Sequence, residues 1–234
     1  MFRFKQFNVD QAGCAMKINT DGVLLGSTAT ANNPLNILDI GTGTGVIAMM
    51  LAQRFPTAQI DAVEIDESAA NTATQNFANS SFNSRLKVYA SGFEEYFDQH
   101  QNPKYDLIVS NPPFYINSLQ SPGEKINLAK HAPQGFFELM IEKAAAQLTS
   151  NGSLWLILPT DTANLVKSVA QQQNLHLQKI ITIRSFSNDA PHREILSFGM
   201  HETPLITDDI TIYDGHKIYN LKYQELLKDF LTIF

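Results

Sequence analysis

Asn36-Ile37-Leu38-Asp39-Ile40 runs directly into Gly41-Thr42-Gly43-Thr44-Gly45, and this stretch decides the fold class. Its first half is an apolar run of the length expected for a buried strand. The glycines lead at once into Val46-Ile47-Ala48-Met49-Met50-Leu51-Ala52, which has the composition of a buried helix. A strand, a glycine turn and a helix in this order let the backbone approach a nucleoside-type ligand. The stretch therefore predicts an α/β fold with a ligand site at the end of this strand.

The next apolar run, Gln59 to Glu64, predicts a second strand that ends in a carboxylate about twenty residues past the glycines. An acid at this position can accept both hydroxyls of a ribose. A solvated strand end is the simpler explanation, but the glycine turn favours the ribose role. Gly43 to Ala48 also fits G-x-G-x-x-G/A, so a nicotinamide dehydrogenase stays open. Asp39 argues against a pyrophosphate because its negative charge suits the positively charged methionyl part of S-adenosylmethionine better.

A later strand, Asp106 to Ser110, ends in Asn111-Pro112-Pro113-Phe114. Consecutive prolines fix φ and carry no N–H, so their carbonyls stay free to accept hydrogen bonds. The Asn111 side-chain oxygen and the Pro112 carbonyl can each take one N–H of a planar amine, and Phe114 can offer its face to the attached ring. A proline-rich turn is the alternative for this tetrapeptide alone. In a doubly wound sheet this strand lies beside the first, so both motifs flank one crevice.

The remaining patterns predict a seven-stranded, mostly parallel sheet with one antiparallel strand and helices on both faces. The antiparallel strand is expected from the hairpin-like pair Leu175 to Arg184 and Arg193 to Met200. We expect one domain over 1–234, with an N-terminal extension or lid (1–36), a core (37–202) and a C-terminal extension (203–234). In the first extension, Thr20 or Asp21 can cap a helix. In the last, apolar residues from Tyr223 to Leu231 fall at helical spacing.

Composition bounds the function. The chain has 234 residues, 44% of them hydrophobic, and a net charge of -6. An acidic protein does not attract nucleic acid by charge alone, so any such partner must be held by local patches. The single cysteine, Cys14, excludes an internal disulfide and a multi-cysteine zinc site. We expect a cytoplasmic monomer without metal or membrane contact, since no run of 18 apolar residues occurs.

Three motifs, Asp39 to Gly45, Glu64 and Asn111 to Phe114, resemble the class I S-adenosylmethionine-dependent methyltransferases that methylate amines. Further stretches are similar to the bacterial tRNA(Val) (adenine-37-N6)-methyltransferase family: Phe4 to Phe7, Cys14 to Gly26, and Pro191-His192-Arg193. This resemblance runs through nearly the whole chain. It implies a Rossmann-like fold, S-adenosylmethionine as cofactor, and methyl transfer to the N6 amine of adenine 37, beside the anticodon of a valine tRNA.

The resemblance also implies roles for single residues. It implies that Asn111 and Pro112 hold the N6 amine and that Phe114 stacks on the flipped adenine. It also implies that the cofactor is bound by Asp39, Gly41, Gly43 and Glu64. We add Gly45, Phe93 and Asn111 as cofactor contacts, although Phe93 can equally fill the core. Substrate contacts are expected from Tyr115, Lys130, His192 and Arg193. Where the family often has an Asp for the cofactor's adenine amine, this chain has Gly92, so that contact must come from backbone, Ser91 or Glu94.

Several alternatives stay open. Glutamine methylation of a release factor uses the same motif, but those enzymes carry a helical domain ahead of the glycine turn, and 38 residues precede Asp39 here. Ribosomal guanine methyltransferases usually carry a second domain. An RNA-binding module without activity is a further alternative, against which the intact Asn111 to Phe114 motif argues. The cations available for RNA are Arg3, Lys5, Lys17, Lys125, Lys130, His192 and Arg193.

Overall fold

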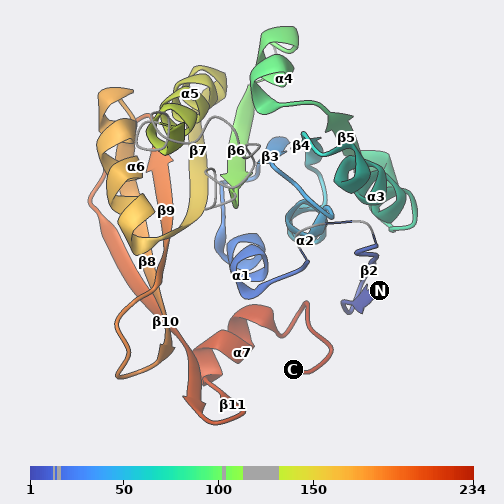
Figure 1. Ribbon diagram of the computed structural model, residues 1–234, viewed down its shortest axis with the longest axis vertical. Helices are drawn as coiled ribbons and strands as arrows, with labels where there is room; N and C mark the ends of the chain where they lie inside the picture. The colour runs from blue at the N-terminus through green and yellow to red at the C-terminus, as the bar shows by residue number, and fades with distance from the viewer. Residues whose placement is uncertain (13, 15–16, 102–103, 113–131) are drawn as a thin grey trace, which may run out of the picture.

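The computed structural model describes residues 1–12, 14, 17–101, 104–112 and 132–234, with backbone only for 132–134. Figure 1 shows one large sheet with helices on both of its faces. In the described residues the sheet has nine strands in the order β11-β10-β8-β9-β7-β6-β3-β4-β5, and β1 and β2 form a separate pair. The described helices do not include one that is both long and apolar enough to cross a membrane.

The predicted core of the sheet is confirmed. Its β9 strand runs antiparallel to both β7 and β8, whereas the pairs around β3, β4, β5 and β6 are parallel. The order places β6 beside β3 on the side away from β4, as expected of a doubly wound sheet. The core strands are β3 (Asn36–Ile40), β4 (Gln59–Glu64), β5 (Leu86–Ala90), β6 (Tyr105–Ser110), β7 (Leu148–Pro159), β8 (His176–Phe186) and β9 (Arg193–Gly199).

The count of seven strands is wrong, because the C-terminal extension adds two. β10 (Ile206–Gly215) pairs in parallel with β8, and β11 (Ile218–Tyr219) pairs antiparallel with β10. β10 carries Thr207, Asp208 and Asp209 near its start, and most of its residues are not buried, so its sequence lacks the apolar run of a buried strand such as β7. Its sequence therefore did not predict a strand.

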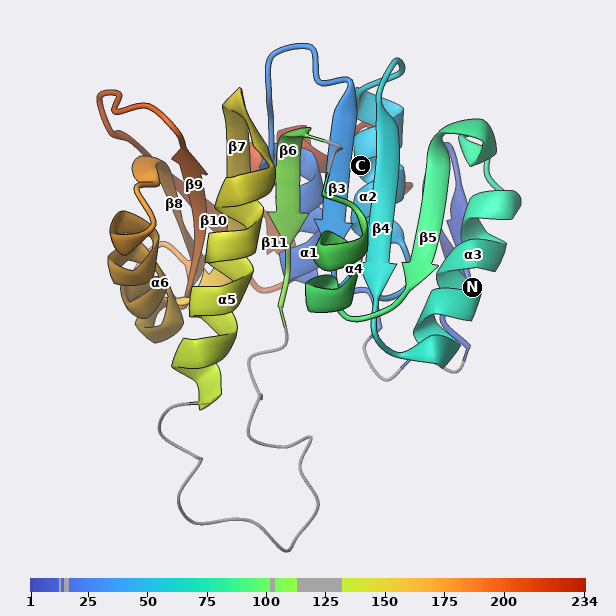
Figure 2. The same ribbon diagram turned by 90° about the horizontal axis from the view of Figure 1, so that it is seen from above.

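Two clusters of buried side chains lie on opposite faces of the sheet. One is formed by α1 (Thr20–Thr28), α2 (Val46–Arg54), α3 (Glu67–Ala78) and α7 (Leu221–Leu227). The other is formed by α4 (Phe93–Gln99), α5 (Ala132–Gln147) and α6 (Thr160–Gln172). Figure 2 shows α4, α5 and α6 on the face opposite α1 and α2. Neighbouring residues of β3 alternate between the clusters, Ile37 in the first and Leu38 in the second, as a strand buried on both faces requires.

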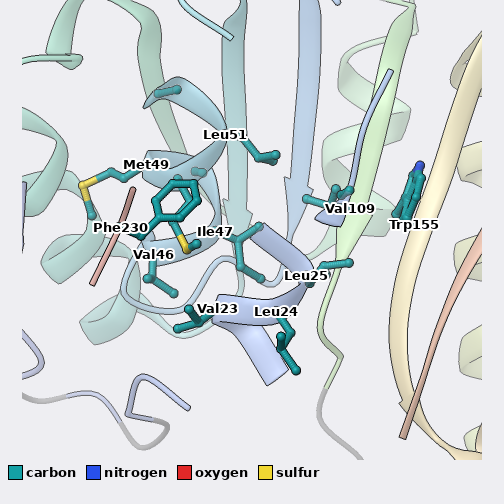
Figure 3. Packing of buried hydrophobic residues seen from close by; sticks show 14 of the residues in the cluster. Val23, Leu24, Leu25, Val46, Ile47, Met49, Leu51, Val109, Trp155 and Phe230 are labelled. Carbon is teal, nitrogen blue, oxygen red and sulfur yellow. The ribbon is translucent and has the colours of Figure 1, made fainter. Parts of the chain in front are cut away.

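Helix α1 packs on α2 directly behind the glycine turn. Figure 3 shows side chains of α1 such as Val23 and Leu25 next to Val46 and Ile47 of α2. The cap of α1 differs from the prediction: Asn19, not Thr20 or Asp21, accepts a hydrogen bond at Oδ1 from the Gly22 N–H at 2.9 Å. All three residue types suit an N-cap, and the fold selects the first of them. Helix α1 is therefore fixed against the core at its first turn.

Candidate active site

The two predicted motifs leave the sheet side by side. Ile40 and Ser110 are register partners in the parallel pair of β3 and β6. The Ser110 hydroxyl donates to the Ile40 carbonyl at 2.8 Å. Their successors, Gly41 and Asn111, therefore start from neighbouring strands about 5 Å apart. The carboxyl edge of the sheet brings the glycine turn and the Asn-Pro motif together, as predicted.

The glycine turn has an open surface. Gly41 and Gly43 have φ angles of 70° and 58°, and a Cβ added to either would meet no atom within 4 Å. Positive φ is where glycine is favoured. Gly45 differs, because its Cβ would lie 2.4 Å from Cε1 of Phe77. Packing against α3 therefore accounts for Gly45, whereas Gly41 and Gly43 leave room for a ligand against the backbone.

Asp39 is a buried carboxylate with one free oxygen. Its Oδ2 accepts hydrogen bonds from the Thr42 hydroxyl at 2.6 Å and from the Ala48 N–H at 3.2 Å. Its Oδ1 is buried without a hydrogen-bond partner among the described residues. The pKa of Asp39 is raised to about 7, chiefly by burial. The charge of Glu64 also raises this pKa, whereas the hydrogen bonds from Thr42 and Ala48 lower it. A ligand cation that reaches Oδ1 would satisfy this oxygen and favour the charged form.

Glu64 holds the glycine turn in place. Its Oε2 accepts from the Gly43 N–H at 2.8 Å, and its Oε1 accepts from the Asp66 N–H at 2.9 Å. Each carboxylate oxygen has a second lone pair, so ribose hydroxyls can still bind.

Ile65, which follows Glu64 directly, was not predicted to be near the site. Ile65 is 78% exposed, and its Cδ1 lies 3.6 Å from where a Cβ on Gly92 would stand. An apolar residue directly after the strand's acid is the signal that could have found it.

Phe93 has a packing position. Only 7% of the residue is exposed, and its ring meets Phe136 edge-on with centroids 5.4 Å apart. The core-filling alternative explains this geometry, and a cofactor contact stays a prediction. Of the residues expected to replace the missing Asp at Gly92, Glu94 lies beside that position: its Oε2 is 3.0 Å from where a Cβ on Gly92 would stand.

Asn111 presents an unused acceptor. Its Oδ1 is buried and has no hydrogen-bond partner in the part of the chain that the structure describes. Pro112, next in the chain, is buried as well. A buried amide oxygen without a partner carries a free-energy cost of roughly 1–3 kcal/mol, which a bound donor would remove. The predicted contacts Phe114, Tyr115 and Lys130 lie outside the described residues.

The other two predicted substrate contacts lie at the same edge of the sheet. Arg193 pairs with Pro159 and Ile183 at the carboxyl ends of β7 and β8. Its Nε donates to Oδ2 of Asp21, in the first turn of α1, at 2.8 Å. His192 is exposed beside it. The positions therefore suit substrate contact, with Arg193 also joined to α1.

Lys5 does not lie near these cations. Its Nζ donates to the Phe234 carbonyl oxygen at 2.9 Å. Together with Gln53 and Arg54 it lines a cavity at the last turn of α2. That turn is about 12 Å along the helix from the glycine turn. Lys5 therefore lies at the far end of α2 from the glycine turn.

Asn76 is a second residue that the sequence did not reveal. Its Nδ2 donates to the Thr44 carbonyl at 2.9 Å and to the Asp10 carbonyl at 3.0 Å, and its Oδ1 accepts from the Asp10 N–H at 2.8 Å. This buried amide joins the N-terminal segment to the glycine turn.

No cluster of three or more His, Cys, Asp or Glu that could hold a metal ion occurs among the described residues.

Comparison with known proteins agrees with this geometry. The Methyltransferase small domain family matches residues 14–175. A tRNA1(Val) (adenine(37)-N6)-methyltransferase of Pedobacter heparinus is 48% identical, covering 100% of this chain and 98% of the relative. A protein of the same name from Christiangramia forsetii is 40% identical, covering 98% and 96%. The crystal structure of a predicted O-methyltransferase from Agrobacterium tumefaciens has a TM-score of 0.70 at 18% identity, covering 90% and 96%. The chain therefore has the class I methyltransferase fold and belongs to the bacterial tRNA1(Val) (adenine(37)-N6)-methyltransferase family.

Proposed function

We propose that this protein transfers a methyl group from S-adenosylmethionine to the exocyclic N6 amine of adenine 37 in a valine tRNA. The relatives that cover nearly the whole chain carry that activity in their names. The observation in the structure that carries the proposal is the buried Oδ1 of Asn111, which has no hydrogen-bond partner among the described residues and lies one strand away from the open glycine turn.

The residues around the glycine turn fit S-adenosylmethionine in four respects. Oδ1 of Asp39 suits the ammonium of the methionyl group, because it is a buried acidic oxygen without a partner among the described residues. Gly41 and Gly43 leave their side of the turn open. Glu64 can accept ribose hydroxyls while it holds the turn, and the exposed Ile65 offers an apolar face to an adenine ring.

When bound, S-adenosylmethionine supplies a methyl group that is already electrophilic. What the protein must add is the alignment of the amine and the release of its lone pair from the ring. The Asn111 side-chain oxygen and the Pro112 carbonyl would each accept one amine N–H. Holding both hydrogens in this way favours a nitrogen whose lone pair points out of the ring plane. The surroundings are buried, so these hydrogen bonds are stronger than in water.

Adenine 37 must leave its stack to reach this acceptor pair. Enzymes that modify a base in a paired or stacked strand turn the base out into a pocket and read its Watson–Crick edge. The N6 amine lies on that edge and carries the two hydrogens that the acceptors require. Stacking on Phe114, which lies outside the described residues, would contribute on the order of 1–3 kcal/mol.

The test is methyl transfer from labelled S-adenosylmethionine to total tRNA from a strain that lacks this gene, with the product nucleoside identified by mass. N6-methyladenosine in a valine tRNA is the expected result, with Asn111→Ala as the inactive control. Transfer to ribosomal RNA or a release factor, and none to tRNA, would keep the amine chemistry and overturn the substrate. The absence of any transfer would overturn the proposal.

A further inference from the structure

The C-terminal extension builds a cavity lined mainly by aromatic rings. The cavity has a volume of about 460 Å³ and is lined by Phe186, Tyr213, His216, Lys217 and Tyr219. The three rings form a ladder: the centroids of Phe186 and Tyr213 are 5.6 Å apart and those of Tyr213 and Tyr219 are 5.1 Å apart. A volume in this range holds a small organic ligand. The proposed methyl transfer uses none of these residues.

The ladder is closed at one end and open at the other. Tyr219 stacks on Tyr223 with an interplanar angle of 9°, and Phe234 meets both rings edge-on. At the opposite end Phe186 remains 42% exposed. The interior rings therefore hold one another rigidly, and the exposed end can accept one more flat ring. Stacking of that kind is how proteins bind unpaired bases without reading their sequence.

A histidine and a lysine line the same cavity as Phe186. His216 and Lys217 are exposed, and neither forms a hydrogen bond or ion pair with another described residue. Lys217 has a φ of 59°, a left-handed conformation that favours glycine. Two carboxylates of the same loops have other hydrogen-bond partners than Lys217: Asp189 accepts from the Phe186 N–H, and Asp214 accepts from the Asn220 side chain. A flat ring beside available positive charge fits a nucleotide, the ring on Phe186 and the phosphate on Lys217.

The cavity lies on the same edge of the sheet as Asn111. Phe186 is the last residue of β8, and its register partner Tyr213 lies near the end of β10. Both strands run in the direction of β6, because β9 is antiparallel to both β7 and β8. β8 lies three strand spacings from β6, about 14 Å across the sheet. Ser110 is level with Ile180 in the register, so Phe186 also lies about 20 Å further along the strand direction. The combined separation, about 24 Å, is the length of roughly seven stacked nucleotides. His192, in the β8–β9 connection with Phe186, lies between the two places.

We infer that this aromatic cavity is a second RNA site, which stacks one unpaired base of the substrate RNA on Phe186 while adenine is held at Asn111. The inference rests on the proposed function, because it names the same RNA as occupant. It explains how an acidic protein can hold RNA, through ring stacking and the local positive charge of Lys217 rather than through net charge.

Two pairs of variants test the site. Phe186→Ala removes the exposed ring, and Leu35→Ala, which removes an exposed apolar side chain before β3 at the opposite edge, is its control. Lys217→Gly removes the cation while keeping the left-handed turn, and Asn33→Gly, at a φ of 47°, is its control. Binding of a fluorescent valine-tRNA stem-loop is measured by anisotropy over a range of salt, beside the single-turnover rate at saturating RNA.

Phe186→Ala is expected to raise the RNA dissociation constant about 5- to 150-fold, with cofactor affinity and the saturated rate unchanged. Lys217→Gly is expected to lower the slope of log affinity against log salt by about one. The controls should behave as the wild type. If Phe186→Ala binds RNA as tightly as Leu35→Ala, the second site is overturned. If the wild type methylates no tRNA, the proposed function fails instead, so the two failures are distinguishable.

Discussion

Replacing Asp39 by Asn is expected to remove a pH dependence of stability and, at the same time, to weaken binding of S-adenosylmethionine. Oδ2 of Asp39 accepts from Thr42 and Ala48, while Oδ1 has no partner among the described residues. An amide oxygen can take over both hydrogen bonds, so Asn keeps the local structure and removes the charge. Its NH2 group would lie unpaired at the Oδ1 position, but that cost is the same at every pH.

The magnitude follows from the pKa. Burial raises the pKa of Asp39 from 3.8 to about 7. The folded protein then holds the proton more tightly than the unfolded chain, so the free energy of unfolding falls as pH rises between these two values. A shift of about three pKa units corresponds to roughly 4 kcal/mol. More than half of this, about 2.5 kcal/mol, falls between about pH 5 and about pH 8. An Asn side chain does not titrate, so the free energy of unfolding of the variant does not fall with pH for this reason.

The assay is urea unfolding of the cofactor-free wild type and variant at both pH values, with cofactor affinity measured by calorimetry. Between the lower and the higher pH, the free energy of unfolding of the variant relative to that of the wild type should rise by about 2.5 kcal/mol. Glu67→Gln, at an exposed carboxylate of α3, controls for the loss of one charge. A difference between Asp39→Asn and wild type that stays constant with pH would refute the pKa argument. Unchanged cofactor affinity would refute the role of Asp39.

Three further results are expected. Asn111→Ala should lose about a hundredfold or more in single-turnover rate at saturating cofactor, by analogy with oxyanion-hole deletions; near-normal turnover would contradict the acceptor role. Gly43→Ala should cost about 1–2 kcal/mol of backbone strain in thermal unfolding, whereas Gly45→Ala should cost clearly more because its Cβ also meets Phe77 at 2.4 Å; equal losses would refute the packing argument. The initial rate at limiting tRNA should fall steeply with salt, since cations and phosphates must meet, and a flat response would count against RNA.

The strands that surround the site could be predicted because their sequences carry the signal locally. β3 and β4 have the predicted bounds, since each is short, has a buried apolar centre and ends in a distinctive feature, the glycines or Glu64. β10 could not be predicted in this way, because most of its residues are not buried and its sequence is half polar. The cap of α1 was missed for a related reason: three adjacent residues can all cap, and only packing selects Asn19.

Within the site, the residues expected to contact ligands were easier to predict than the residues that hold the glycine turn in place. Asp39, Glu64 and Asn111 lie where the motifs placed them, at one edge of the sheet. Asn76 was missed because its amide joins Asp10 to the glycine turn across the fold, a contact that no local pattern encodes. Ligand contacts by all of these residues remain predictions.

The contact between residues 4–7 and residues 228–234 has a consequence for how the protein is made. The Lys5 N–H donates to the Phe230 carbonyl at 2.8 Å, and Phe4 forms a bridge with Leu231. Figure 1 shows the two ends of the chain on the same side of the molecule. A ribosome that adds about 5–20 residues per second needs on the order of ten seconds or more between the two segments. The segment that Asn76 ties to the glycine turn therefore gains this anchor only after residues 228–234 have been made, so chains that stop before residue 228 would lack a fully supported methyl-donor site.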